Sequence, residues 1–311
     1  MPLDPQVEML LQRMAAAGLP PYPSLSPEEA RRVMEARSAM TAGEPPTVGS
    51  VSDMVVPGPS GGIPLRVYTP IGHPPFPVLV YFHGGGFVLG SLETHDSLCR
   101  AIAARSECAV VSVEYRLAPE HKFPAAVEDA VADTNWVAAH ASTIHCDAER
   151  LAVGGDSAGG NLATVVAHIA RDAGSPRLRF QLLLYPVTDH TFSSPSYQEN
   201  GAGYMLSRAD MEWYRDHYLR SEADRSHPHA SPLLAEELHG LPPALVITAE
   251  FDPLRDEGEA YAARMKEAGV PVELHRYSGM IHGFVRMYPV LDAGKMALDE
   301  IGDALRRALA R

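Results

Sequence analysis

The sequence has few of the features that mark secreted or membrane proteins. Only three of its 311 residues are cysteine, at positions 99, 108 and 146. This odd and small number excludes a disulfide framework and fits a reducing compartment, so we expect a cytoplasmic protein. The N-terminus lacks the basic start and apolar stretch of a signal peptide. No apolar run approaches the roughly 18 residues that a membrane span requires.

Positive charge is also scarce. The chain has 26 lysines and arginines against 39 acidic residues, a net charge of −13 at pH 7, and its only lysines are Lys122, Lys266 and Lys295. A protein that binds nucleic acid without sequence preference needs an excess of basic residues, and docking on anionic lipid needs one too. The charge balance therefore argues against nucleic acid and membrane as partners. The sequence carries no signal of its oligomeric state.

What the chain does contain, from about residue 50, is an alternation of short apolar runs with helical patterns. Several runs are almost wholly apolar, as expected for parallel strands covered on both faces. Such alternation is typical of an α/β protein with a doubly wound, mostly parallel sheet. The predicted strands are 65–68, 77–82, 109–115, 151–154, 180–185, 244–249 and 272–277. The predicted helices are 95–105, 124–140, 158–172, 255–268 and 292–310.

Two segments lie outside this alternation. The N-terminal segment has apolar residues at helical spacing over 5–17, and Ser26 followed by Pro-Glu-Glu predicts the start of a second helix. The second segment has no clear strand but a helical pattern near 207–219. Because long structureless loops are uncommon in compact domains, we predict an inserted helical cap, joined by the N-terminal helices. The predicted units are a cap from 1–48 and 187–240, and a catalytic core from 49–186 and 241–311.

The strongest local motif is Gly-x-Ser-x-Gly at 155–159, between a predicted strand and a predicted helix. A sharp strand-to-helix turn needs glycine beside it because the backbone crowds itself there. The turn projects the hydroxyl of Ser157, and the following helix N-terminus favours negative charge nearby. An ordinary glycine-rich turn can carry the same pattern, but this placement favours a nucleophile.

A second motif consists of three consecutive glycines after His83, at the end of the predicted strand 77–82. Such a run costs conformational entropy and needs a reason, although a flexible turn is the simpler alternative. A loop whose backbone N–H groups point at a ligand atom would justify it, since acyl transfer needs two or three donors for its oxyanion. We therefore predict an oxyanion loop here, with His83 bracing the loop rather than acting as a catalyst.

A serine hydroxyl becomes a good nucleophile when a base takes its proton and a carboxylate orients that base. Asp252 lies just beyond the strand 244–249, where its side chain can reach across the sheet; Glu250 and Asp256 are the alternatives. His282 lies in the loop after the last predicted strand. The chain order serine, acid, histidine is that of α/β hydrolases.

The other histidines, of fourteen in all, occupy less suitable positions. His227 and His229 form a His-x-His pair, but no cysteine or acidic cluster completes a metal site, which favours a solvated loop. His121 lies in an expected turn and His275 within an expected strand. We expect neither a metal nor a cofactor.

Together these motifs resemble those of the hormone-sensitive-lipase-like family of bacterial carboxylesterases. The resemblance covers nearly the whole chain. It rests on five stretches, namely 83–86 (HGGG), 115–120 (YRLAPE), 154–161 (GGDSAGGN), 252–256 (DPLRD) and 282–284 (HGF). The family implies an α/β-hydrolase fold with a helical cap, and ester hydrolysis through an acyl-enzyme without a cofactor. We expect the stretch 115–120 to be a structural turn.

The resemblance also implies a role for each motif residue. It makes Ser157 the nucleophile, Asp252 the acid and His282 the base. The same resemblance implies an oxyanion hole formed by the N–H groups of Gly84, Gly85 and Ala158.

The expected cap helix carries apolar residues at helical spacing, which form either its own core or the lining of an acyl pocket. These residues are Leu206, Met211, Trp213 and Tyr214. As substrate contacts we predict Phe87, Leu206, Met211 and Tyr214.

The sequence as a whole predicts a serine carboxylesterase that cleaves small-molecule esters of short to medium acyl chains. A non-catalytic binding protein is one alternative, since plant gibberellin receptors look like this family but have lost the triad histidine, which is present here as His282. A lipase, amidase or deacetylase would keep the chemistry and change the substrate. The predicted cap is not an obvious apolar lid, which favours soluble esters.

Overall fold

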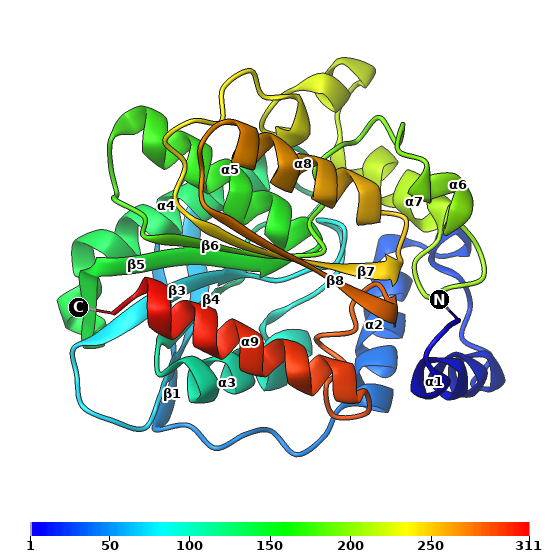
Figure 1. Ribbon diagram of the computed structural model, residues 1–311, viewed down its shortest axis with the longest axis horizontal. Coiled ribbons are helices and arrows are strands. Elements are labelled where there is room, and N and C mark those ends of the chain that lie inside the picture. The colour runs from blue at the N-terminus through cyan, green and yellow to red at the C-terminus, as the bar shows by residue number, and fades with distance from the viewer. Residues whose placement is uncertain (1, 311) are drawn as a thin grey trace.

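A single eight-stranded sheet forms the centre of the computed structural model, which describes residues 2–310 (Figure 1). The strand order is β1-β2-β4-β3-β5-β6-β7-β8. β2 runs antiparallel to both of its neighbours, and every other pair is parallel. The strands are β1 (Ser50–Gly58), β2 (Gly61–Thr69), β3 (Phe76–Phe82), β4 (Ala109–Val113), β5 (Cys146–Asp156), β6 (Phe180–Leu184), β7 (Ala244–Phe251) and β8 (Val272–Ile281).

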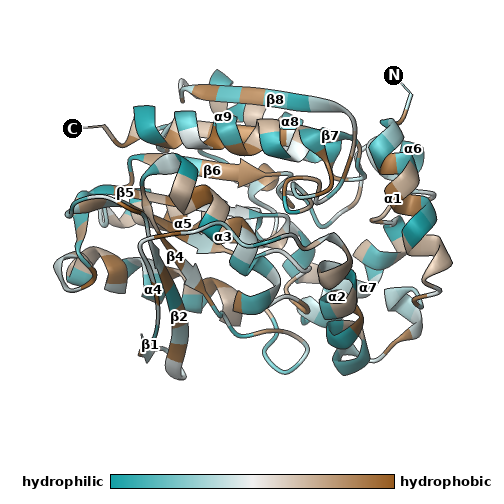
Figure 2. Ribbon diagram, turned by 90° about the horizontal axis from the view of Figure 1, so that it is seen from below, coloured by the Kyte–Doolittle hydropathy of each residue, from teal (hydrophilic) through white to brown (hydrophobic). Residues whose placement is uncertain are grey.

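Helices cover both faces of the sheet, and each face has its own hydrophobic core (Figures 1 and 2). Side chains alternate between these cores along a strand: Val80 of β3 lies in one core, and Leu79 and Tyr81 lie in the other. The first core is closed by α4 (Ala125–His140), α5 (Ala158–Ala173) and α8 (Arg255–Glu267). The second core is closed by α3 (Leu92–Ser106) and α9 (Asp292–Ala308).

This architecture confirms the predicted mostly parallel α/β sheet, including each of the predicted strands and helices to within a few residues. The sequence missed β1, which pairs with β2 through a tight hairpin that places Gly58 opposite Gly61. Among the residues of β1 only Val56 is buried, because the strand lies at the edge of the sheet. The apolar residues of β1 are few and mostly not buried, so the strand gave no clear signal.

The N-terminal segment and the segment between β6 and β7 meet beyond the carboxyl ends of the parallel strands (Figure 1). Tyr22 links them, since its ring lies 6.5 Å from that of Trp213 and 6.0 Å from that of Tyr214. The N-terminal elements are α1 (Pro5–Ala16), η1 (Tyr22–Ser24) and α2 (Pro27–Thr41). The later elements are α6 (Ser196–Glu199), α7 (Arg208–Tyr218), η3 (Glu222–Ser226) and η4 (Pro232–Leu234).

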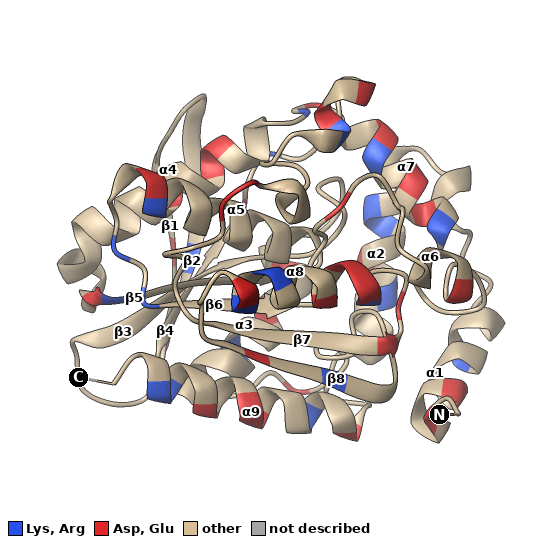
Figure 3. Ribbon diagram, turned by 45° about the horizontal axis from the view of Figure 1, so that its top comes forward, with Lys and Arg blue, Asp and Glu red and all other residues tan. Residues whose placement is uncertain are grey.

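Charged residues of both signs are mixed along the outer helices rather than separated onto two faces (Figure 3). Arg66, for example, pairs with Asp53 and with Glu93. Within residues 2–310, every helix is too short or too polar to span a bilayer.

The turn between β5 and α5 depends on a close approach of the helix to β3. A Cβ atom on Gly159 would overlap the carbonyl oxygen of Phe82. Glycine at this position therefore lets α5 start directly under the neighbouring strand, which fixes where the turn points.

We expect Gly159→Ala to destabilise the protein by about 1–3 kcal/mol or more, because a fixed backbone atom blocks the new methyl group. Gly258→Ala is the matched control in another helix, since its Cβ would meet nothing closer than 3.5 Å. That change should be neutral or stabilise by about 0.5–1 kcal/mol. Urea unfolding of both variants measures the difference, and equal effects would contradict this account of the turn.

Candidate active site

Ser157 lies in the turn between β5 and α5 with a backbone that few non-glycine residues adopt, at φ 57° and ψ −118°. Hydrogen bonds on both sides hold this strained conformation. Its N–H donates to the carbonyl of Leu184 at 2.8 Å, and its carbonyl accepts from the N–H of Val187 at 3.1 Å. The strain is therefore maintained by β6 and the loop after it, and the side chain lines a pocket.

Asp252 and His282 lie next to Ser157 in one hydrogen-bonded line. His282 Nε2 is 3.0 Å from Ser157 Oγ, and His282 Nδ1 is 2.7 Å from Asp252 Oδ2. The other oxygen of Asp252 accepts from the N–H of Leu254 at 2.8 Å, and Asp252 is fully buried. This is the arrangement that a base-activated serine requires.

The alternative acids point elsewhere. Glu250 accepts from the N–H of Gly279 at 2.7 Å, and Asp256 pairs with Arg255 at 2.7 Å. The sheet geometry explains the difference, because Asp252 lies beyond the last paired residue of β7, where its side chain is free to turn toward the loop after β8.

Gly84 does not fit the predicted oxyanion role. Its N–H donates to Asp156 Oδ1 at 3.0 Å, and the Tyr81 hydroxyl donates to the same oxygen at 2.8 Å. The N–H groups of Gly85, Gly86 and Ala158 donate no hydrogen bond within residues 2–310. Gly86 therefore replaces Gly84 as the candidate donor, a distinction that a run of three glycines in the sequence does not reveal.

The ring of His83 contacts this loop through Nδ1, which lies 2.9 Å from the carbonyl oxygen of Gly84. Its ring stacks on Tyr115 with centroids 4.3 Å apart, and the Tyr115 hydroxyl donates to the His83 carbonyl at 2.7 Å. Burial lowers the pKa of His83 to about 3, so the ring is neutral. The turn 115–120 also holds the loop from its other end, since the N–H of Ala118 donates to the carbonyl of Phe87 at 2.9 Å.

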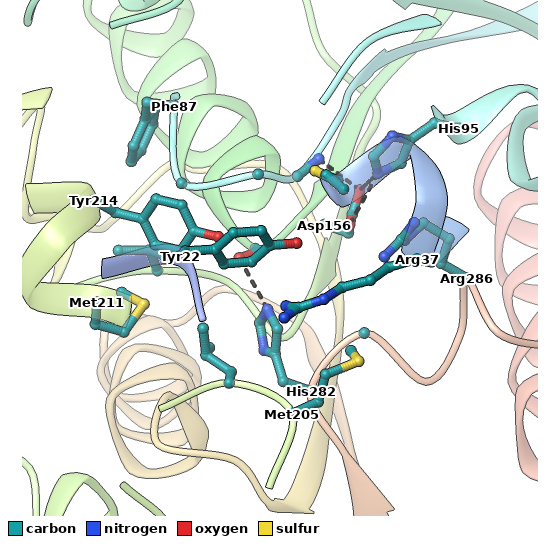
Figure 4. Close-up of a pocket in the computed structure, with 18 of the residues that line it drawn as sticks. Tyr22, Arg37, Phe87, His95, Asp156, Met205, Met211, Tyr214, His282 and Arg286 are labelled. Carbon is teal, nitrogen blue, oxygen red and sulfur yellow. Dashed lines mark hydrogen bonds and ion pairs between the residues drawn. The ribbon is translucent and has the colours of Figure 1, made fainter. Parts of the chain in front are cut away.

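The pocket over Ser157 and His282 is lined by all four predicted substrate contacts, which Figure 4 shows in part. These are Phe87, Leu206, Met211 and Tyr214. Trp213 is not part of the lining and instead packs on Tyr22 and His217. The expected cap helix thus contributes to both its own core and the pocket.

Most of the pocket wall that comes from segments other than the expected cap helix was not predicted from the sequence. The additional lining residues are Met14, Tyr22, Met34, Arg37, Thr41, Gly86, His95, Asp156, Val187, His190, Met205, Gly283, Arg286 and Met287. Most of them lie on α1, η1, α2 and the loops after β6 and β8, and their positions could not be foreseen without knowing how these segments fold together.

Two arginines line the side of the pocket opposite Tyr214 in Figure 4. Arg37 lies over the ring of Tyr22 at 4.4 Å, and Arg286 donates to Ser38 Oγ at 2.7 Å. Neither makes an ion pair within the described part of the chain. They connect α2 to the segment that follows His282, so the N-terminal segment forms part of the wall of this site.

The histidines set aside in the sequence lie outside the pocket. His227 Nδ1 accepts from the N–H of His229 at 3.0 Å, and His275 contacts Glu300. The N–H of His121 closes a turn with the carbonyl of Leu117 at 2.9 Å. In residues 2–310, His, Cys, Asp and Glu form no group of three or more that could hold a metal ion.

Comparison with known proteins identifies the family of this chain. A family model described as the alpha/beta hydrolase fold matches residues 79–286. The chain belongs to the α/β-hydrolase family. Within that family it is one of the hormone-sensitive-lipase-like enzymes, and its relatives are named as carboxylic ester hydrolases and esterases.

Two curated relatives and one solved structure illustrate the similarity. The carboxylic ester hydrolase LipN of Mycobacterium tuberculosis is 47% identical over 84% of this chain and 71% of its own length. An ethyl acetate hydrolase of Pseudomonas putida is 39% identical over 99% of this chain and 100% of its own length. The esterase of Pyrobaculum calidifontis has a TM-score of 0.95 at 45% identity, over 99% of both chains.

The buried neutral histidines predict a specific pH dependence of stability. Burial lowers the pKa of His168 to about 4, below the ordinary value of about 6.5. Its contribution to stability is therefore present above pH 6.5 and is lost as the pH falls toward 4. Asp133 and Glu257 act in the opposite direction, because burial raises the pKa of both carboxyl groups.

Because these groups oppose one another in the pH profile of the wild-type protein, the test compares the stability of variants at two pH values. We expect the destabilisation caused by His168→Gln, measured by urea unfolding, to be smaller at pH 5 than at pH 7 by roughly 2 kcal/mol. His239→Gln, at an exposed position, is the control and should show no such change. A destabilisation by His168→Gln that is the same at both pH values would contradict a neutral buried imidazole.

Proposed function

We propose that this carboxylic ester hydrolase is a serine enzyme that cleaves esters of short to medium acyl chains through a covalent acyl-enzyme. The observation that carries the proposal is the hydrogen-bonded line from Asp252 through His282 to Ser157 at the floor of an apolar pocket. Beside that line lie the backbone N–H groups of Gly85, Gly86 and Ala158, which have no acceptor among residues 2–310.

In the first half of the reaction, Ser157 Oγ attacks the ester carbonyl carbon while His282 Nε2 takes its proton. Asp252 orients the ring through Nδ1 and stabilises the imidazolium that forms. The carbonyl oxygen becomes an oxyanion, which accepts hydrogen bonds from the N–H groups of Gly85, Gly86 and Ala158. The alcohol leaves with the proton held by His282.

In the second half, a water molecule replaces the alcohol. His282 takes a proton from this water, which attacks the acyl carbon bound to Ser157. The second oxyanion occupies the same hole, and its collapse releases the carboxylic acid and returns the proton to Ser157 Oγ. The complete cycle consumes only the ester and one water molecule.

The cap assigned to residues 1–48 and 187–240 supplies the substrate selectivity in this proposal. Tyr22 and Met34 come from the first part, and Leu206, Met211 and Tyr214 come from the second. Their apolar surface favours the acyl chain of an ester, and the enclosed pocket suits a small molecule. The printed name of one relative, ethyl acetate hydrolase, describes a small ester of this kind.

Ser157→Ala tests the nucleophile. We expect the turnover of p-nitrophenyl butyrate to fall by about four orders of magnitude or more, because the acyl-enzyme cannot form. The melting temperature should stay close to that of the wild type, since the hydroxyl is the only group lost. Ser142→Ala, at an exposed position, is the matched control and should keep full activity.

A fluorophosphonate label gives the second readout for the same residue. It should attach to Ser157 in the wild type and in Ser142→Ala. In Ser157→Ala, Ser142 should stay unlabelled. Turnover retained by Ser157→Ala would refute the proposed mechanism.

Asp156→Asn tests whether the oxyanion loop is positioned by this buried carboxylate. Asparagine removes the negative charge of the acceptor, so the hydrogen bonds from the Gly84 N–H and the Tyr81 hydroxyl become weaker and the contact with His95 changes. We expect kcat to fall by up to about a hundredfold, less than the full loss of an oxyanion donor, with little change in KM. Tyr81→Phe removes one of these bonds and should cost less; an unchanged kcat in Asp156→Asn would contradict the positioning role.

A further inference from the structure

His190 is a buried residue of the pocket wall whose ring has no hydrogen-bond partner. The side chain is 2% exposed, and neither Nδ1 nor Nε2 is within hydrogen-bond reach of another group in residues 2–310. The residue nevertheless lines the same pocket as Ser157 and His282. Because buried polar atoms almost always have partners, two unpaired nitrogens in a substrate pocket require an explanation.

The backbone of this segment is held by a series of hydrogen bonds, which fix the point from which the His190 side chain starts. The N–H of Val187 donates to the Ser157 carbonyl at 3.1 Å, and the N–H of His190 donates to Ser231 Oγ at 2.8 Å. Between them, the N–H groups of Thr188 and Asp189 donate to the buried Glu257 carboxyl at 2.7 and 3.2 Å. The loop after β6 therefore fixes His190 relative to the nucleophile.

The surroundings of the ring are aromatic. The rings of Phe87, Tyr218 and Phe192 lie 6.0, 5.9 and 6.4 Å from it between centroids. The Tyr218 hydroxyl also has no partner in the described part of the chain and does not hydrogen-bond to the imidazole. Burial also lowers the pKa of His190 to about 4, so at neutral pH the ring has one N–H donor and one nitrogen acceptor.

We propose that His190 is a substrate-selecting residue that hydrogen-bonds to a hydroxyl group carried by the ester. A hydroxyl can donate to the bare nitrogen of a neutral imidazole or accept from its N–H, so one hydroxyl can satisfy either of the two unpaired nitrogens. An aliphatic ester leaves both nitrogens unsatisfied in an apolar wall, and sites with such groups discriminate strongly against the analogue that lacks the partner. The preferred substrates are therefore hydroxylated esters, an inference that rests on the proposed esterase function.

The experiment uses pairs of esters that differ by one hydroxyl, followed by acid release in a pH-stat. Ethyl 3-hydroxybutyrate with ethyl butyrate tests the acyl side, and 3-hydroxypropyl butyrate with propyl butyrate tests the alcohol side. For each pair the measured quantity is the ratio of kcat/KM between the hydroxylated and the plain ester. In His190→Phe, which keeps a planar ring without nitrogen, we expect this ratio to fall about tenfold or more in at least one pair.

Two further variants separate the hydrogen bond from packing. His190→Asn keeps a donor and an acceptor, so its ratio should stay closer to that of the wild type than the ratio of His190→Phe. If His190→Phe does not fold, His190→Leu takes its place. His168→Leu is the matched control, because it also removes a buried imidazole but lies outside the pocket. Its ratio should equal that of the wild type.

Ratios in His190→Phe and His190→Leu within about twofold of the wild type, for both pairs, would overturn the inference. The plain esters keep this outcome distinct from a failure of the proposed function. If ethyl butyrate is cleaved and Ser157→Ala abolishes that cleavage, the function stands and only the role of His190 falls. If no ester is cleaved, the proposed function falls first.

Discussion

The carboxylate of Asp156 joins the two loops that make up the reactive part of the site. It precedes Ser157 at the end of β5 and accepts the N–H of Gly84 from the loop after β3. Burial by itself raises the pKa of Asp156, but the contacts with His95 and Tyr81 outweigh it and hold the pKa below its ordinary value. The carboxylate therefore stays charged, and a charged acceptor fixes the distance between the nucleophile turn and the oxyanion loop.

The parallel sheet supplies the rest of the arrangement. β3, β5, β7 and β8 run in the same direction, so the residues that follow them meet at one edge. Ser157, Asp252 and His282 come from three of these strand ends, and the glycine loop comes from the fourth. None of the side chains has to reach far, which explains how a chain of hydrogen bonds of 2.7 and 3.0 Å forms between residues distant in the sequence.

The walls of the pocket are less regular than its floor, and the sequence predicted them less well. Leu206, Met211 and Tyr214 lie on or beside one helix whose apolar spacing is visible in the sequence. The arginines and His190 carried no such signal, because a charged residue or a lone histidine looks like surface until its neighbours are known. Likewise β1 was missed since it lies at the edge of the sheet, with side chains that remain largely exposed.

By itself, the sequence determined the order of strands and helices, the serine turn, and the acid and histidine that stand at strand ends. These features depend on local rules, namely apolar periodicity and the glycine that a sharp turn requires. Only the tertiary structure decided which one of the three glycine amides is occupied by a hydrogen bond, because that depends on where Asp156 lies across the sheet. It also decided that the N-terminal segment closes the pocket and that His190 lacks a partner, since both follow from contacts between segments far apart in the chain.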